Sequence, residues 1–546
     1  MANPATATAT SRTRAPAARA VQPPAARQAR RRLLGAPRGL LLAGALVALV
    51  VVLPVGITLI QGLEGGVSAA VKAIDASSAR TLLLHSILVA AVAAPLAGLI
   101  GASSAWFIER TRLPARGLWT LLAVAPLTMP LFVTSYAWAS LGTLTQGFLG
   151  AAGIIAFSYY PIVFLLAAVA LRGMDPALEE TAHSLGLNTR QTFFRVILPQ
   201  LRPALLGGML LVVLDTLVEF DAFVALKYQT FTVHIYAQYE LSFSASGAAA
   251  LSMFSIVLCV VLLFAESRLR GGANYTRVSH GVQRPVTRYR LGRATVPVLL
   301  AFAVGAAISV GIPVGTLVYW FTQSTSAGLA GASANVRYLG PATLTSVGLG
   351  VSGALVALVF ALPISLLAVR HRGRLATLLE RSTYLSFALP DLVAAIALAY
   401  AASHYAPSLY DNIVLLVLAE AMLFVPFAVV AMRATFGQIE PALEDSARSL
   451  GLGPLRAFAR VTAPLARPGM AAAGVLVFAF VLGDLGTAQV LLPPNLYTLG
   501  TEFQANSATV AFAAAAPFAA VLVALSMLAA FVLMSRFGRV RALGSS

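Results

Sequence analysis

The sequence predicts an all-α membrane protein of about twelve transmembrane helices, arranged as two parallel six-helix repeats. Three observations lead to this fold class. Charged residues make up only 11% of the 546, mean hydropathy is +0.84, and one polar phrase occurs twice. Apolar runs of about 20 residues recur, the length that a helix needs to cross a bilayer. Since these runs are continuous rather than alternating, they predict helices that satisfy their own backbone in lipid.

The twelve candidate spans divide equally between two halves of the chain. In the first half they lie near 38–60, 83–107, 117–140, 147–171, 203–225 and 247–266. In the second half they lie near 294–322, 343–369, 382–403, 411–431, 469–491 and 509–535.

Basic residues predict the orientation of these spans. With both termini in the cytoplasm, all but four of the 38 Lys and Arg residues fall in cytoplasmic segments. The exceptions are Lys72, Arg80, Lys227 and Arg337. This is the positive-inside bias of an inserted bundle. The net charge of +18 is spread over short loops beside lipid headgroups, so it does not predict a nucleic-acid partner.

A polar phrase marks an internal duplication. PALEETAHSLGL at 176–187 nearly recurs as PALEDSARSLGL at 441–452, and 176–203 matches 441–468 at 15 of 28 positions. An even number of spans in each half makes the repeats parallel. The predicted organisation begins with a disordered basic tail at 1–37. A first repeat at 38–270 follows, with its polar loop at 172–202. A linker at 271–293 then leads to a second repeat at 294–541, with its polar loop at 432–468.

Each copy of the phrase predicts a short helix that stops at a glycine. Leu178, Ala182 and Leu185 form a narrow apolar stripe at helical spacing. Gly186 and Gly451 supply the left-handed residue that ends a helix. Loops that merely connect spans would be capped in the same way. A shared docking partner better explains why these loops stay so similar while the spans around them have drifted further.

The phrases resemble the EAA loop found in permease subunits of binding-protein-dependent ABC importers, present twice as in fused permeases of the ferric-iron type. Mild departures from the pattern are Thr181, Ser446, Asp445 and Ala463. The loop residues that the resemblance assigns to ATPase coupling are Glu179, Glu180, Ala182, Gly186, Glu444, Asp445, Ala447 and Gly451.

The resemblance implies a type I importer permease fold in a bacterial plasma membrane. It also implies two partners, a cytoplasmic ATPase dimer that grips both EAA loops (172–202 and 432–468) and an extracytoplasmic substrate-binding protein. The two halves would then alternate between outward-open and inward-open states. No G-x4-G-K-[ST] phosphate loop occurs in this chain. ATP hydrolysis is therefore assigned to a separate subunit, and neither enzymatic activity nor a cofactor is expected.

Acidic residues inside predicted spans are candidates for the translocation pathway, because buried charge is costly. Glu219 and Asp221 fall late in the fifth span, and Asp484 lies 265 residues after Glu219 in the eleventh. Asp391 and Glu420 lie in the ninth and tenth spans. The alternative is that some of them pair with a hydroxyl, a backbone group or an interfacial arginine. No metal ligands are identified from the sequence.

Ferric iron is the leading cargo. The segments 220–239 and 483–503 resemble outer-loop regions of ferric-iron permeases, and hard Fe(III) prefers carboxylate and phenolate oxygen. Tyr228, Tyr236, Tyr239 and Tyr497 lie nearby, although tyrosine is also common at membrane interfaces. Related permeases carry thiamine, polyamines or phosphonates, which remain alternatives. An ion-coupled secondary transporter would also show two related halves, but it has no ATPase to dock. No HExxH or GxSxG motif is placed for an intramembrane enzyme.

Overall fold

The described part of the chain is helical throughout. The computed structural model describes residues 37–64, 77–174, 176–242, 245–269, 288–326, 337–371 and 373–543. Its only extended pairing in these ranges is an isolated bridge between Thr111 and Tyr289. The prediction of an all-α bundle is confirmed. The predicted tail, apart from residue 37, and most of the predicted linker lie outside the described residues.

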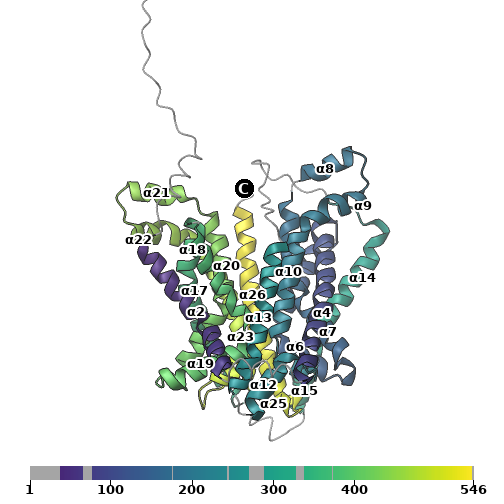
Figure 1. The fold of residues 1–546 in the computed structure, drawn as a ribbon. Coiled ribbons are helices and arrows are strands. Elements are labelled where there is room, and N and C mark those ends of the chain that lie inside the picture. Colours follow the sequence, from purple (N-terminus) through teal and green to yellow (C-terminus); the bar gives the residue numbers. More distant parts are fainter. Residues whose placement is uncertain are drawn as a thin grey trace, which may run out of the picture.

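Long helices form the framework of each half (Figure 1). In the first half they are α2 (Arg38–Glu64), α4 (Ser77–Arg110), α7 (Phe148–Gly173), α10 (Leu198–Val218) and α13 (Ala245–Leu269). In the second half they are α14 (Thr295–Ala306) and α15 (Ile312–Ser326), joined by the π-helical turn η5 (Ala307–Gly311), then α17 (Leu339–Arg370), α20 (Ile413–Gln438), α23 (Ala463–Gly483) and α26 (Phe512–Leu543).

Two predicted spans are broken rather than continuous. Among the described residues, nine helices are long and apolar enough to cross a membrane, or up to eleven if each bent pair counts. The predicted span 117–140 is α5 (Arg116–Val124) with η1 (Ala125–Thr128), followed at 90° by α6 (Leu131–Ala139). The predicted span 382–403 divides in the same way into α18 (Arg374–Thr383) with η6 (Tyr384–Ala388), and α19 (Asp391–Tyr405).

Proline explains both breaks. Pro130 and Pro390 immediately precede α6 and α19, and the residue before each proline is extended. Proline lacks the N–H that a continuous helix requires and disfavours helical geometry at the preceding residue. A continuous span was therefore the wrong expectation at these two places.

The fifth and eleventh spans end earlier than predicted. Helix α10 stops at Val218 and α23 at Gly483, and each is followed by a short helix, α11 (Asp221–Ala225) or α24 (Gly486–Leu491). The chain then forms α12 (Phe231–Ser242) and α25 (Leu499–Ala508) at one end of the bundle (Figure 1).

A matched pair of serines holds the starts of these two outer helices. The backbone N–H of Phe231 donates to Ser86 Oγ on α4 at 2.9 Å, and that of Leu499 donates to Ser346 Oγ on α17 at 2.9 Å. Both serines are buried, so each bond satisfies a helix N–H that would otherwise lack a partner. The two halves therefore fix their outer helices by the same contact.

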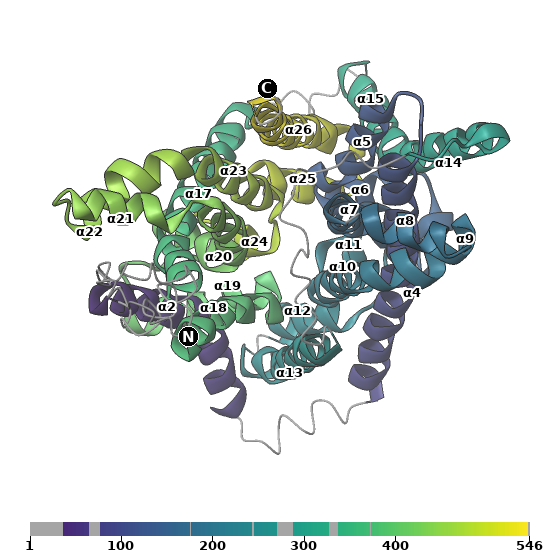
Figure 2. The ribbon, with the colours of Figure 1, turned by 90° about the horizontal axis from the view of Figure 1, so that it is seen from above.

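The first helix of each half packs against the other half. Helix α2 contacts α17, α18 and α19, whereas α15 contacts α6 and α14 contacts α5. Seen from above, α2 lies beside α18 and α19, and α14 lies on the side of α4 and α7 (Figure 2). The halves are interlocked as well as linked.

Small residues allow the core helices of the first half to approach closely. A Cβ on Gly101 of α4 would lie 2.7 Å from the Tyr160 carbonyl oxygen and 2.8 Å from the Phe164 nitrogen, both on α7. A Cβ on Gly208 of α10 would lie 3.0 Å from Val163 Cα. Such contacts let membrane helices gain dispersion energy where no hydrophobic driving force separates protein from lipid.

We predict that Gly101→Leu destabilises the bundle by about 1–3 kcal/mol, because the side chain would push α4 away from the backbone of α7. The measurement is the thermal unfolding midpoint of the purified protein in detergent. Gly153→Leu is the matched control, since a Cβ there meets no atom within 4 Å. Equal midpoints for the two variants would contradict the close crossing.

Candidate EAA loops and acid cluster

The two EAA loops lie at one end of the bundle, on opposite sides of it (Figure 1 and Figure 2). The first contains α8 (Pro176–Ser184), α9 (Thr189–Thr192) and the π-helical turn η3 (Phe193–Ile197). The second contains α21 (Pro441–Ser449), α22 (Pro454–Ala457) and the π-helical turn η7 (Phe458–Thr462). The two π-helical turns start 265 residues apart, so the duplication extends to this irregular feature. We call the end of the bundle that carries the two EAA loops the loop end.

Glycine closes each EAA helix in the same geometry. Gly186 has φ +83° and Gly451 has φ +87°. The N–H of Leu187 donates to the Ala182 carbonyl at 3.1 Å, and the N–H of Leu452 to the Ala447 carbonyl at 3.2 Å. These bonds satisfy carbonyls at the end of the helix in a Schellman arrangement. The predicted left-handed glycines are confirmed in both copies.

The predicted apolar stripe divides into a buried and an exposed part. Ala182 and Ala447 face inward and are buried. The equivalent leucines Leu185 and Leu450 are 76% and 85% exposed. An exposed leucine therefore occupies the same place in both EAA loops. Of the acids, Glu180 is exposed and Asp445 is half-buried.

In the first EAA loop, a buried arginine holds the second-span helix against the loop. Arg110, the last residue of α4, is 1% exposed, and its Nη1 lies 2.6 Å from Glu179 Oε1. Its Nη2 also donates to the Leu171 carbonyl at the end of α7 at 3.0 Å. Tyr289 donates to Glu179 Oε2 at 3.4 Å. Burial and the neighbouring Glu179 raise the pKa of Tyr289, which keeps its phenol a donor.

The second EAA loop uses an equivalent anchor. Arg370, the last residue of α17, lies 3.0 Å from Glu444 and donates to the Ile439 carbonyl at 3.1 Å. Thr462 takes the place of Tyr289 and donates to Glu444 at 2.7 Å. Glu179 and Glu444 therefore face the bundle. Sequence reasoning missed both arginines, although each is the basic residue that ends the second span of its half.

Glu219 and Asp484 occupy equivalent places where long helices stop. Glu219 follows α10 and Asp484 follows α23, each as the extended residue at the C-cap. Glu219 Oε1 accepts the backbone N–H of Ala222 at 3.0 Å, and its Oε2 accepts the Tyr159 hydroxyl at 3.3 Å. The predicted symmetry of these two carboxyls is present in the structure.

Asp484 lies at the centre of the five candidate acids. It is within electrostatic range of Glu219, Asp221, Asp391 and Glu420. The five acids, which we call the acid cluster, thus join α10–α11 of the first half to α19, α20 and α23 of the second. Gly486 permits the approach, because a Cβ there would lie 2.7 Å from Asp391 Oδ2.

Several oxygens of the acid cluster have no protein partner. Asp221 Oδ1, Glu420 Oε2 and Asp484 Oδ2 are buried without a hydrogen bond, and Glu420 is only 1% exposed. In the described ranges, no ion pair involves any of the five acids. The alternative that an arginine neutralises them is therefore not supported there. Buried acids without partners are costly and are retained in membrane proteins mainly for function.

Three of the four tyrosines named from the sequence lie against other aromatic rings. Tyr228 stacks on His85, Tyr236 lies against Phe220, and Tyr497 lies against Tyr338. Within the described residues, no group of three or more His, Cys, Asp or Glu side chains has the geometry of a metal site.

A phenol that reaches the acid cluster is that of Tyr159 on α7, which donates to Glu219. The residue 265 positions after Tyr159 is Phe424, so the duplication gave no sign of it. A tyrosine two residues before the mid-span Pro161 was the available signal.

Comparison with known sequences decides the family. The model of binding-protein-dependent transport system inner membrane components matches residues 95–270 and again 361–540. The chain belongs to this family. Each match spans one EAA loop and the long helices beside it, and the two matches confirm the two-repeat fold. The exact domain boundaries stay predictions.

Relatives of this chain are named for different transported substrates. The chain is 33% identical to Fe(3+)-transport system permease protein FbpB 2 of Haemophilus influenzae, over 89% of this chain and 96% of that protein. It is 26% identical to ferric transport system permease protein FbpB of Actinobacillus pleuropneumoniae, over 61% of this chain and 50% of that protein. It is 29% identical to sulfate transport system permease protein CysT of Escherichia coli, over 36% of this chain and 78% of that protein.

We predict that Arg110→Met loosens the first EAA loop, because Glu179 is left buried without its cation at a cost of about 3–5 kcal/mol. The measurement is the rate of trypsin cleavage at Arg190, which is exposed on this loop. The rate should rise, and adding Glu179→Gln should lower it again by removing the unpaired charge. Arg374→Met, at an exposed site on α18, is the control and should leave the rate unchanged. An unchanged rate in Arg110→Met would contradict the anchor.

Proposed function

We propose that this chain is the membrane-spanning permease of an ABC importer for ferric iron, with its translocation pathway between the two halves. The acid cluster carries the proposal, since five carboxyls gather where the halves meet and three of their oxygens are buried without partners. The membrane is a bacterial plasma membrane. The loop end and both termini face the cytoplasm, as the distribution of basic residues predicts.

A cation is the cargo that the acid cluster favours. Carboxylate oxygens are hard donors that suit Fe(III), and the Tyr159 phenol beside Glu219 adds a donor of the same kind. An anion such as the sulfate named for the CysT relative would meet like charge there. The Haemophilus influenzae relative, named for Fe(3+) transport, matches nearly the whole chain and supports the same cargo. Thiamine, also a cation, is the alternative to be separated by experiment.

A separate ATPase dimer drives the cycle. Each ATPase subunit receives one EAA helix, with Leu185 or Leu450 entering the contact as an exposed apolar side chain. When the dimer closes, it moves α8 and α21 together. Arg110 and Arg370 pass this displacement to α4 and α17, because the ion pairs tie each loop to its helix. An extracytoplasmic binding protein delivers cargo at the opposite end, where α12 and α25 lie (Figure 1).

Translocation then depends on the helix breaks after Val218 and Gly483. Each break places a carboxyl at a helix C-terminus, where the partial negative charge of the helix also favours a cation. Two short helices, α11 and α24, follow the breaks and can shift without unwinding a full span. Alternation of the two halves would expose the acid cluster first to one side and then to the other.

We expect Glu219→Gln combined with Asp484→Asn to abolish most iron uptake at unchanged protein level. The neutral amides keep the size of the acids but remove the charge that binds the cation. The measurement is uptake of radioactive Fe(III) by proteoliposomes containing the permease, its ATPase and its binding protein, with thiamine assayed in parallel.

Asp411→Asn is the control for this experiment. Asp411 is an exposed acid with φ +55°, a conformation that asparagine adopts readily. Wild-type uptake by the double variant would refute the pathway. If the protein takes up thiamine but no iron, and this uptake depends on the two acids, then thiamine replaces iron as the proposed substrate and the proposed pathway stands.

We expect Leu185→Ser combined with Leu450→Ser to release the ATPase. Both side chains are exposed, so the bundle keeps its fold while the apolar contact is lost. The measurement is the amount of ATPase retained when the tagged permease is purified. Leu118→Ser, at an exposed leucine of α5, is the control. Full retention by the double variant would show that these leucines do not form the contact.

A further inference from the structure

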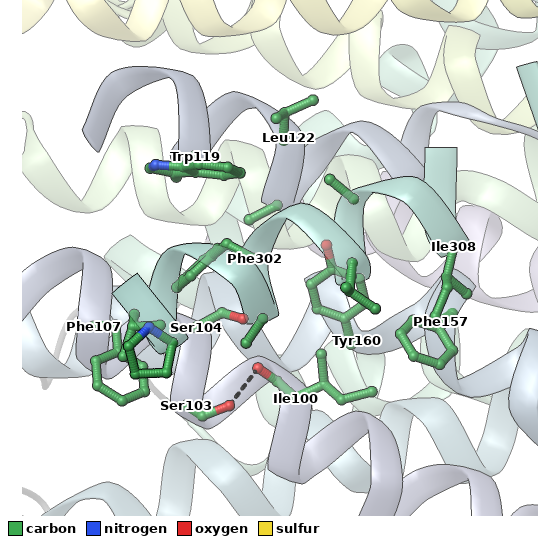
Figure 3. Close-up of a pocket in the computed structure, with 17 residues that line it drawn as sticks. Ile100, Ser103, Ser104, Phe107, Trp119, Leu122, Phe157, Tyr160, Phe302 and Ile308 are labelled. Carbon is green, nitrogen blue, oxygen red and sulfur yellow. Dashed lines mark hydrogen bonds between the residues drawn. The ribbon is translucent and has the colours of Figure 1, made fainter. Parts of the chain in front are cut away.

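A cavity of about 480 Å³ lies beside the first half, and none of the five acids lines it (Figure 3). It lies between α4, α5 and α7 on one side and α14 with η5 on the other. Its volume falls within the range of about 300–1,000 Å³ that ligand pockets occupy. The lining is mainly carbon. Its largest side chains are Phe107, Trp119, Phe157, Tyr160 and Phe302.

The cavity exists because α14 leans away from the bundle. None of the residues of α14 is buried, whereas Ser309 and Val310 in the next turn are. The helix returns to the bundle through the π-helical turn η5, just before Pro313. A proline cannot supply the N–H that closes the preceding turn, so a bend is favoured here. Contact with the first half is made by the ring of Phe302, which lies 5.5 Å from that of Trp119.

The equivalent place in the other half is closed, so the fold itself does not require the cavity. There α2 takes the position of α14, and Ala48 packs with Leu367, Ala376 and Leu379 in one cluster. A Cβ on Gly44 would lie 2.7 Å from Leu367 Cδ1. The cavity beneath α2 near Val51 measures about 10 Å³. The open wedge is a property of the first half.

The depth of the cavity matches one leaflet of a bilayer. Its lining residues on α14 and η5 run from Pro297 to Ile308, a helical rise of about 16 Å. Half of the hydrocarbon core is about 15 Å thick. One end lies at Phe107, three residues before α4 ends at Arg110 at the loop end. With the loop end in the cytoplasm, as proposed above, the cavity spans the cytoplasmic leaflet.

Three exposed arginines lie close in sequence to the lining residues at the cytoplasmic end of the cavity. Arg112 follows α4, and Arg290 and Arg293 precede α14; all three are exposed. The segment around Tyr289, just before α14, is held beside the end of α4, because the Arg112 backbone N–H donates to the Tyr289 carbonyl at 3.0 Å. Exposed arginines at this level attract the anionic headgroups of the cytoplasmic leaflet.

We propose that this cavity is a binding site for an anionic phospholipid of the cytoplasmic leaflet. One acyl chain fills the wedge between α14 and the helices α4 and α7, and the headgroup lies among Arg112, Arg290 and Arg293. The apolar lining, the one-leaflet depth and the basic rim all fit this occupant. The lipid completes the packing that α2 achieves by direct contact in the other half.

The test uses Trp119 as a reporter inside the cavity. A full-length variant carrying Trp106→Phe, Trp138→Phe and Trp320→Phe retains Trp119 as its single tryptophan. It is reconstituted in nanodiscs containing phosphatidylglycerol with dibrominated acyl chains, and its fluorescence is compared with that in unbrominated lipid. Strong quenching is expected, because the bromines enter the cavity. No quenching would overturn the proposal.

Filling the cavity should remove this signal. Gly305→Phe adds a ring to a cavity-lining residue whose Cβ would meet no atom within 4 Å. Gly315→Phe is the control, because a Cβ on Gly315 also meets no atom within 4 Å, but this residue lies on α15 and does not line the cavity. Quenching should be largely lost in Gly305→Phe and kept in Gly315→Phe. Equal quenching in both would mean that Trp119 meets only the surrounding bilayer, which overturns the site. Gly305→Leu serves as a second filling variant if Gly305→Phe does not fold.

The headgroup is tested separately. Dibrominated phosphatidylcholine at the same mole fraction should quench Trp119 less than phosphatidylglycerol does. Arg290→Gln combined with Arg293→Gln should remove this preference, and Arg374→Gln, at the equivalent end of the second half, should keep it. Equal quenching by the two lipids in the parent protein would overturn the anionic preference. These measurements involve neither cargo nor ATPase, so they stand apart from any failure of the proposed transport function.

Discussion

Two ion pairs, one buried and one partly buried, fix how each EAA loop meets the membrane bundle. Arg110 and Arg370 end the long helices α4 and α17, and each binds the glutamate of its loop together with a backbone carbonyl. Arg110 is buried and must be paired, because an isolated buried charge costs several kcal/mol. The loop therefore cannot move away from its helix without exposing or unpairing that charge.

The same two helices connect the loops to the acid cluster. Helix α4 packs on α7 and α10, and α17 packs on α20 and α23. Glu219 and Asp484 lie where α10 and α23 stop. One continuous packed path thus leads in each half from an exposed loop to a carboxyl at the interface between the halves. The ion pairs are its starting points.

The sequence was informative wherever a feature was long or duplicated. Helix existence, the repeat, the left-handed glycines and the equivalence of Glu219 with Asp484 all followed from hydropathy or from the constant offset of 265. Breaks at Pro130 and Pro390 did not, since a bent pair and a straight span have the same mean hydropathy.

Interactions between distant residues could not be predicted from the sequence. The approach of Asp391 and Glu420 to Asp484 depends on how three helices cross. Likewise, Arg110 was counted only as a topology signal, because its pairing with Glu179 depends on tertiary structure. Comparing residues 265 positions apart also cannot reveal a feature that only one half has. Tyr159 donates to Glu219 in the first half, but its counterpart in the second half is Phe424.

The two halves use one architecture with different polar chemistry. In the first half, Asp221 follows the helix break, where the second half has Gly486. The second half instead places Asp391 after its proline break, against that same glycine. The acid cluster is therefore a joint product of both halves, and neither half contains all of its carboxyls.

The exchange of first helices between the halves constrains the order in which the protein can be made. Helix α2 leaves the ribosome before its partners α17, α18 and α19, which follow roughly 300 residues later, about 15 to 60 seconds at ordinary rates of synthesis. Among the described elements of its own half, α2 packs most extensively against α13. The first half thus waits in the membrane as an incomplete intermediate, and final assembly is a late, whole-chain event rather than two successive domain foldings.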